Sequence, residues 1–232
     1  MRLDKMIGNS GLDTRKNIKR NAKKGAILVN GEVIKDSSYQ VDPEVDEVYY
    51  MGQFVDYFEN IYIMMNKPQG YLSATEDKDP TVIDLLDDFY RVLDLSIAGR
   101  LDKDTTGLLL LSTDGKFIHR VTSPNSNIEK TYIAKTRDPI DESLIDPFKE
   151  GVYIKEDDYT ARSAKLEIIG KNEAKVIVTE GKFHLVKRLF SNCGNEVVEL
   201  KRVAIGDLEL DSHLGLGEYR ELSDDEVSYF VE

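Results

Sequence analysis

The chain has 232 residues, of which 41% are hydrophobic and 32% charged, with a formal net charge of -12. A single cysteine excludes an internal disulfide framework, and three scattered histidines lack the spacing of zinc ligands. Neither a signal-peptide core nor an apolar run of about 18 residues is present, which argues against secretion and a membrane span. We therefore expect a soluble, cytoplasmic protein with no metal site, and a monomer.

The charge is unevenly distributed along the chain. The first 40 residues contain nine Lys or Arg and four Asp or Glu, a net charge of +5, so the other 192 residues carry -17. A short basic end on an acidic body is typical of a segregated surface that binds a polyanion, although a solvated helix face would give the same pattern.

The N-terminal elements are short. Apolar spacing predicts two basic helices between residues 1 and 24, with Asn9-Ser10-Gly11 as a helix stop and Asp13-Thr14 as a start. A strand at 27–29 follows, and Asn30-Gly31 predicts a hairpin that returns through Val33-Ile34. The length allows two globular units, and we place the end of the first near residue 58.

A second unit begins with a buried strand at 61–66. Further on, the pattern predicts a helix over 82–86, a strand over 107–113 and a short helix over 116–122. Additional strands are expected at 130–135, 164–169, 174–179 and 206–210. Helices interrupt these strands irregularly, so the fold class is predicted to be mixed α+β rather than a doubly wound parallel sheet.

Three separated segments carry residues suited to chemistry on a base. Residues 98–115, AGRLDKDTTGLLLLSTDG, hold Asp102 between two glycines that permit tight backbone. Residues 129–132, EKTY, offer a ring for stacking and a lysine for phosphate. Residues 180–190, EGKFHLVKRLF, cluster basic groups among apolar ones. Each segment has a plainer interpretation: a loop cap, a core tyrosine and a solvated helix start.

Taken in order, these segments resemble the family of ribosomal pseudouridine synthases that modify single uridines, and in particular its small-subunit branch. The resemblance covers essentially the whole chain. It extends over MRLDK (1–5), NKPQG (66–70), GRLDKDTTGLLLLSTDG (99–115), TSP (122–124), EKTY (129–132), EGKFHLVKR (180–188), GNEVVEL (194–200) and GEYR (217–220).

The resemblance implies two domains and a set of site residues. It implies an RNA-binding module over 1–58, similar to that of a ribosomal small-subunit protein, and a catalytic domain with a mainly antiparallel sheet over 59–232. Asp102 matches the family's catalytic aspartate, Lys187 the basic residue that pairs with it, and Tyr132 the tyrosine that stacks on the target base. The residues expected to bind RNA are Arg100, Lys130, His184 and Arg188 in the catalytic domain, and Arg2, Lys5, Arg15, Lys16, Lys19 and Arg20 in the module.

The implied reaction isomerises uridine to pseudouridine in ribosomal RNA without a cofactor, because nothing is oxidised or hydrolysed. Asp102 would act either as a nucleophile toward the sugar or as the base that takes a ribose proton. The target nucleotide would have to be flipped out of its stack. The small-subunit branch implies uridine 516, in the customary numbering of 16S rRNA, as the target.

Three alternatives remain open from the sequence: a large-subunit rRNA enzyme, a catalytically inactive RNA-binding assembly factor, and a hydrolase that releases uracil. Two positions depart from the family pattern. Leu185 stands where glutamine is common and Phe183 where tyrosine is usual, so polar roles at those positions are absent.

Overall fold

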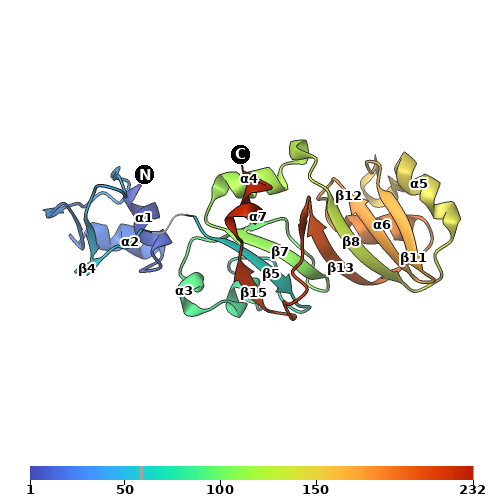
Figure 1. Ribbon diagram of the computed structural model, residues 1–232, viewed down its shortest axis with the longest axis horizontal. Coiled ribbons are helices and arrows are strands. Elements are labelled where there is room, and N and C mark those ends of the chain that lie inside the picture. The colour runs from blue at the N-terminus through green and yellow to red at the C-terminus, as the bar shows by residue number, and fades with distance from the viewer. Residues whose placement is uncertain (58–59, 232) are drawn as a thin grey trace.

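The computed structural model describes residues 1–57 and 60–231. The molecule is elongated, with the N-terminal module at one end of its long axis and the sheet of the larger domain filling the rest (Figure 1). Strands β5, β7 and β15 lie in the middle of the view, and β8, β11 and β12 lie toward the end opposite the module. The predicted α+β class is confirmed by this mixed architecture with a mainly antiparallel sheet.

The N-terminal module has its own apolar core, built from two helices against a four-stranded antiparallel sheet of order β2-β1-β3-β4. Its elements are α1 (Leu3–Asn9), α2 (Arg15–Ala22), β1 (Ile27–Val29), β2 (Glu32–Val33), β3 (Val48–Tyr50) and β4 (Gln53–Phe54). The core continues to Val55. The predicted boundary at residues 58 and 59 lies outside the described residues.

Local sequence explains the first hairpin of the module but not the second. Asn30 and Gly31 both have positive φ, 51° and 84°, as the expected two-residue turn requires. The β3–β4 turn uses the same conformation at Met51 (φ 50°) and Gly52 (φ 83°). Methionine is an unusual residue for positive φ, so the sequence did not indicate this second hairpin.

The larger domain is organised around a nine-stranded sheet in which β13 and β7 pair in parallel and all other pairs are antiparallel. The main strand order is β11-β12-β8-β13-β7-β5-β15, with β6 added on β7 and β14 on β13. The strands are β5 (Tyr62–Lys67), β6 (Ser96–Ala98), β7 (Thr106–Ser112), β8 (Lys130–Thr136), β11 (Lys165–Gly170), β12 (Glu173–Val178), β13 (Val197–Ile205), β14 (Leu208–Glu209) and β15 (Tyr219–Glu221).

Helices and short turns connect these strands. The α-helices are α3 (Asp88–Arg91), α4 (Gly115–Thr122), α5 (Ile145–Glu150), α6 (Leu185–Asn192) and α7 (Asp224–Ser228). The 3-10 turns are η1 (Val82–Leu85), η2 (Pro124–Ser126), η3 (Glu142–Leu144) and η4 (Lys155–Asp157), and β9 (Tyr153–Ile154) pairs with β10 (Tyr159–Thr160) as a separate hairpin.

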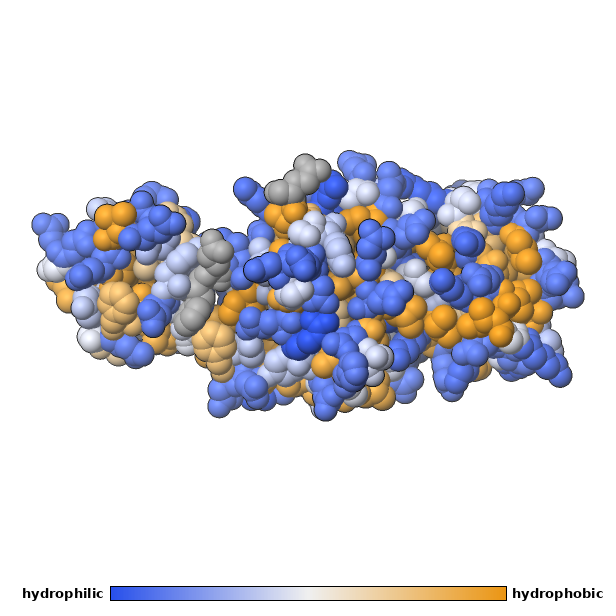
Figure 2. All heavy atoms as spheres, viewed as in Figure 1, coloured by the Kyte–Doolittle hydropathy of each residue, from blue (hydrophilic) through white to orange (hydrophobic). Residues whose placement is uncertain are grey.

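The two halves of the sheet are covered differently. Strand β7 is apolar and buried on both faces, because Leu109 and Leu111 belong to one core cluster and Leu108 and Leu110 to another. The half formed by β8, β11 and β12 buries one face under α5 and α6. On the visible side, hydrophilic groups dominate, while hydrophobic ones collect over β13, β8 and β11 (Figure 2).

Two sequence predictions in this domain were wrong, and one strand was missed. The helix expected over 82–86 is only a 3-10 turn. A capping box between Thr81 and Asp84 begins it, and the chain becomes extended at Leu86. The strand expected over 206–210 shrinks to β14 because Gly206 turns the chain with positive φ. The nine-residue strand β13 was missed, since its apolar residues are interrupted by Glu199, Lys201 and Arg202.

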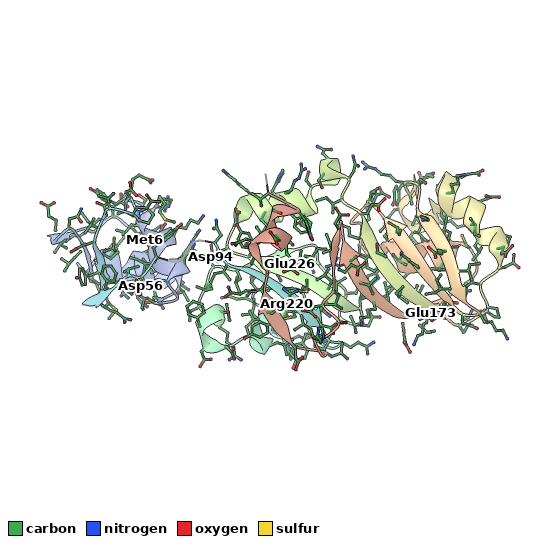
Figure 3. All side chains as sticks on the ribbon, viewed as in Figure 1. Met6, Asp56, Asp94, Glu173, Arg220 and Glu226 are labelled. Atoms are coloured by element: carbon green, nitrogen blue, oxygen red, sulfur yellow. The ribbon has the colours of Figure 1, made fainter. Side chains whose placement is uncertain are left out.

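The module contacts the larger domain beside α3. Arg15 at the start of α2 forms an ion pair with Asp94 at 3.0 Å, and Asp94 lies on the side of the larger domain that faces the module (Figure 3). Gly11 lies against the Phe89 ring. Within the described ranges, none of the helices is both long and apolar enough to cross a bilayer.

Candidate active site

A cavity of about 720 Å³ opens where the two halves of the sheet meet. The loop between β6 and β7, strands β8 and β13, and the start of α6 supply its walls. Asp102, Tyr132, His184, Arg100 and Lys130, which are all sequence-predicted site residues, line this cavity. Its volume lies within the range of small-molecule sites.

Asp102 stands between two basic side chains of α6 and its N-terminal cap. Its Oδ2 accepts a hydrogen bond from Lys187 Nζ at 3.1 Å, and its Oδ1 lies 3.3 Å from His184 Nε2. The Asp102 side chain is 22% exposed and that of Lys187 is 21% exposed.

Asp104 completes this charge cluster. Lys187 Nζ also donates to Asp104 Oδ1 at 2.6 Å. Burial acts to lower the pKa of Lys187, but its hydrogen bonds to Asp104 and Asp102 outweigh burial and raise that pKa. Burial acts to raise the pKa of Asp104, and the Lys187 hydrogen bond and charge bring it below its usual value. Lys187 is therefore a fixed cation beside the Asp102 carboxylate.

Lys67 hydrogen-bonds to the backbone of the loop that carries Asp102. This lysine ends β5 and is fully buried, and its Nζ donates to the backbone carbonyls of Pro68, Asp102 and Thr105, each at 3.0 Å. Burial lowers the pKa of Lys67 to about 8. At neutral pH the group stays mainly protonated, so that its N–H bonds match the carbonyls around it.

Ser73 fixes the same loop one residue before Asp102. Its hydroxyl donates to the Leu101 carbonyl at 2.8 Å and accepts from the Leu101 amide at 3.0 Å. The Gly70 amide donates to the Lys103 carbonyl at 2.8 Å. Backbone contacts on both sides thus determine where the Asp102 side chain lies.

Tyr132 lies on the sheet floor of the cavity, directly opposite Arg202 in the β8–β13 register. Arg202 is only 1% exposed, and it donates to the carbonyls of Leu108 and Gly99, both at 2.8 Å. It therefore ties β13 to β7 and to the first residue of the Asp102 loop. Tyr132 packs against both halves of the core, which leaves its ring half-buried at their junction.

Gly107 permits the close approach of β7 to β13. Its φ is 102°, and a Cβ at this position would lie 2.1 Å from the carbonyl oxygen of Arg202. No side chain fits there. Gly107, which was expected to allow tight backbone in this segment, is thus required by the parallel pairing of β7 with β13 beside the cavity.

The remaining predicted RNA-binding residues of the larger domain lie in different settings. Arg100 is exposed at the cavity. Arg188 does not offer a free cation, because its side chain is 15% exposed and pairs with Asp157 at 2.8 Å. Lys130 was expected to meet backbone phosphate, but it is 5% exposed and lies inside the cavity. Neither is therefore an exposed cation: Arg188 turns toward β9–β10, and Lys130 faces inward from β8. Their expected contacts with RNA stay predictions.

The basic residues of the module divide into two groups. Arg2 is paired with Asp4 at 2.6 Å and Arg15 with Asp94, whereas Lys5 is half-buried on α1. The three others are exposed on α2 and, across the residues that the structure describes, take part in no ion pair: Lys16, Lys19 and Arg20.

Sequence reasoning assigned no role to Lys67 or Arg202. Lys67 belongs to the NKPQG motif and Arg202 to the missed strand β13. A basic residue within an otherwise buried apolar stretch was the available signal, since such a residue requires backbone or acidic partners.

The arrangement suits covalent or acid–base chemistry on a ligand enclosed in the cavity. A carboxylate held by a fixed cation can attack an electrophilic carbon or accept a proton, and the tyrosine ring offers a stacking surface. Within residues 1–57 and 60–231, no group of three or more His, Cys, Asp or Glu side chains is placed to hold a metal ion.

Comparisons with known families match both parts of the chain. The family described as RNA pseudouridylate synthase matches residues 61–192, which include Asp102, Tyr132 and Lys187. The S4 domain matches residues 1–46, within the N-terminal module.

Individual relatives match over nearly the full length. The chain is 46% identical to an uncharacterized RNA pseudouridine synthase of Bacillus subtilis, covering 98% of this chain and 97% of that one. It is 40% identical to the ribosomal small subunit pseudouridine synthase A of Haemophilus influenzae, covering 100% of both. A crystal structure of a pseudouridylate synthase is 40% identical, with a TM-score of 0.72 and complete coverage of both chains.

Proposed function

This chain belongs to the RNA pseudouridylate synthase family, and from that premise we propose that it isomerises a uridine of ribosomal RNA, with Asp102 as the catalytic carboxylate. The observation that carries the assignment is the contact of Asp102 with Lys187 at 3.1 Å inside the cavity that Tyr132 also lines. Pseudouridine synthase activity follows from the family, and the roles of these residues are our proposal.

The target uridine must leave its stack to reach Asp102. Flipping a nucleotide costs a few kcal/mol, which stacking and backbone contacts offset. Tyr132 supplies the stacking surface in the cavity, and the exposed Arg100 side chain grips the displaced nucleotide or fills the gap it leaves. The walls of the cavity then exclude water while the base turns.

Lys187 keeps the carboxylate charged during this step. A nearby cation favours the ionised form of an acid even when a bound ligand removes water. The raised pKa of Lys187 means that this cation persists through neutral pH. Asp102 either forms a bond to the ribose or takes a ribose proton, and both routes require the ionised carboxylate.

We propose small-subunit rRNA as the substrate and uridine 516, in the customary 16S numbering, as its target. The support is the likeness over the full chain to relatives named as ribosomal small subunit pseudouridine synthase A. The exposed residues Lys16, Lys19 and Arg20 of α2 would contact phosphate. The cytoplasmic location and the monomeric state expected from the sequence stay predictions.

The test is to incubate the protein with unmodified small-subunit rRNA or an assembly intermediate, and separately with unmodified large-subunit rRNA, and to map pseudouridine by carbodiimide-blocked reverse transcription. The matched control is Asp102→Asn, which we expect to bind the RNA but to form no product. Normal turnover by this variant would contradict the assignment of Asp102. Pseudouridine confined to large-subunit rRNA would overturn the proposed target, and release of free uracil would indicate a hydrolase.

A further inference from the structure

Two buried basic side chains line the cavity without contacting the Asp102 carboxylate. Lys130 is 5% exposed and Arg202 is 1% exposed. Lys130 Nζ donates to the carbonyl of Ile128 at 3.0 Å, and Arg202 donates to two backbone carbonyls. In the part of the chain that the structure describes, neither is ion-paired with a carboxylate.

Such a pair of cations is unfavourable in the free enzyme. Burying a charge without an opposite charge is energetically unfavourable. Burial, and to a smaller degree the charge of Arg202 on the neighbouring strand, lower the pKa of Lys130. A ligand that carries negative charge at this point would relieve both costs.

The sheet register places this positive charge beside the stacking ring. Arg202 is directly opposite Tyr132 in the β8–β13 pair. Lys130 precedes Tyr132 by two residues in β8, and side chains two apart share one face of a strand. A base stacked on Tyr132 would therefore have cations along its edge. The RNA backbone stays outside when a base swings inward, so the base and not a phosphate meets them.

We propose that Lys130 is a further catalytic residue that donates a hydrogen bond to a carbonyl oxygen of the uracil ring, with Arg202 as a fixed positive charge behind it. This inference rests on the proposed function and holds for either role of Asp102. Lys130 would act as oxyanion-binding donors do in other enzymes, by stabilising a negative charge that exists only during the reaction.

The charge arises when the bond between ribose C1′ and uracil N1 breaks. The electron pair of that bond stays on N1 and is delocalised onto O2 and O4, so the detached base is an anion. Either an Asp102 oxygen forms a bond to C1′, or Asp102 takes the C2′ proton and leaves a C1′–C2′ double bond. C5 of the base then forms a bond to C1′. On the first route this breaks the bond from Asp102 to C1′, and on the second Asp102 returns its proton to C2′. Finally C5 loses its proton and N1 gains one.

The test compares Lys130→Met and Lys130→Arg with the wild type at saturating small-subunit rRNA, in single turnover. We expect Lys130→Met to slow pseudouridine formation about 100-fold, because one lost oxyanion donor has about this effect. Filter binding should give an RNA Kd within about twofold of wild type, since uracil is neutral before the bond breaks. Lys130→Arg should restore most of the rate.

The free energy of unfolding distinguishes a catalytic from a structural lysine. Replacing a buried charge by a methionine of similar size should leave stability unchanged or raise it, so the variant should be slow but stable. The matched control is Lys135→Met, in the same strand but 50% exposed and paired with Glu199 at 2.8 Å, which should keep the wild-type rate.

Three outcomes would overturn the inference. The first is a Lys130→Met rate within about threefold of wild type, because a lost oxyanion donor has a much larger effect. The second is a Lys130→Met protein that is slow because it is partly unfolded. The third is a folded Lys130→Arg variant that is as slow as Lys130→Met. A wild-type protein that forms no pseudouridine in any rRNA would instead overturn the proposed function, and the inference with it.

Discussion

The N-terminal module and the cavity of the larger domain both use basic side chains, but they place them in opposite environments. Lys16, Lys19 and Arg20 are exposed on α2, in contact with solvent. Lys67 and Arg202 are almost completely buried and donate to backbone carbonyls. Exposed charges act over distance and are screened by salt, whereas buried charges fix geometry and are screened much less.

The exposed and the buried cations have two different tasks, which the net charge of the whole chain does not reveal. The chain carries -12 overall, yet the exposed side chains that would attract RNA and the buried Lys67 and Arg202 side chains that hold the cavity backbone are all positive. Surface lysines can bind phosphate without a defined geometry. A buried cation is retained only where it has specific partners, since burying it alone is costly. Mutations in the two regions should therefore affect different measurements.

The largest effect is expected from Gly107→Ala, which separates the strands that Arg202 joins. The added Cβ would lie 2.1 Å from the Arg202 carbonyl oxygen, and the residue would keep a φ of 102°. We expect the free energy of unfolding to fall by about 4 kcal/mol or more, with loss of activity. Urea denaturation measures the change.

Gly115→Ala is the matched control for this substitution. Gly115 begins α4, and apart from its chain neighbours and the backbone of its own helix, no atom of the described residues lies within 4 Å of the position its Cβ would take. Alanine should be neutral or stabilise the helix by up to about 1 kcal/mol. Equal stability losses at the two glycines would contradict the close-approach argument.

Sequence alone could predict the regular parts of this fold. The apolar run of β7, the Asn30-Gly31 turn and the separate strands β8, β11 and β12 follow from local pattern. The position of Asp102 near Lys187 does not, because β7 and α6 meet only through the tertiary fold. The pairing of Asp102 with Lys187 was expected from the family resemblance, and the structure places the two groups 3.1 Å apart.

Which basic residues are buried, and what they contact, could not be predicted in the same way. Lys130 and Arg188 look alike in sequence as basic residues among apolar ones, but β8 turns the first inward and α6 turns the second toward Asp157. Strand β13 was missed because its polar residues mask the period of an element buried in the middle of a sheet. Such residues acquire their roles from neighbours distant in sequence.

Removing the three exposed cations of α2 tests the other side of the comparison. We expect Lys16→Ala, Lys19→Ala and Arg20→Ala combined to weaken RNA binding by about 30- to 100-fold at low salt, and to reduce the slope of log affinity against log salt by about 2 to 3. The rate at saturating RNA should stay unchanged, because none of the three lines the cavity.

Filter binding at several salt concentrations measures this effect. The control is the same number of substitutions at other exposed lysines, Lys149 on α5, Lys165 on β11 and Lys171 just after β11, and these elements lie at the end of the molecule opposite the module (Figure 1). If these reduced the salt dependence equally, RNA binding would depend on net charge and not on α2.

Lys67 should make stability depend on pH with a defined sign. Its pKa is about 8 in the folded protein, below its usual value of 10.5. Between these values the unfolded chain binds more protons, so stability rises with pH. Relative to Lys67→Met, the wild type should gain about 2 kcal/mol from pH 7 to pH 9.5.

Urea denaturation of both proteins at the two pH values gives the comparison, because titrations shared by the two chains cancel in the difference. The added stability should be absent below pH 7 and approach its full value only near pH 10.5. A difference that stays constant with pH would show that the folded-state pKa of Lys67 is unshifted, and would contradict its description as a buried cation.

The smallest effect is expected from Asp94→Asn, at the contact between module and larger domain. Arg15 pairs with Asp94 at 3.0 Å, and both side chains are about half exposed. Removing the carboxylate frees Arg15 for phosphate, so RNA affinity should rise about two- to fivefold at low salt and little at high salt. Asp88→Asn changes the net charge equally, but Asp88 pairs with Arg91. An equal gain from Asp88→Asn would mean that Arg15 contributes no specific contact, and that the module binds RNA through the remaining cations of α2.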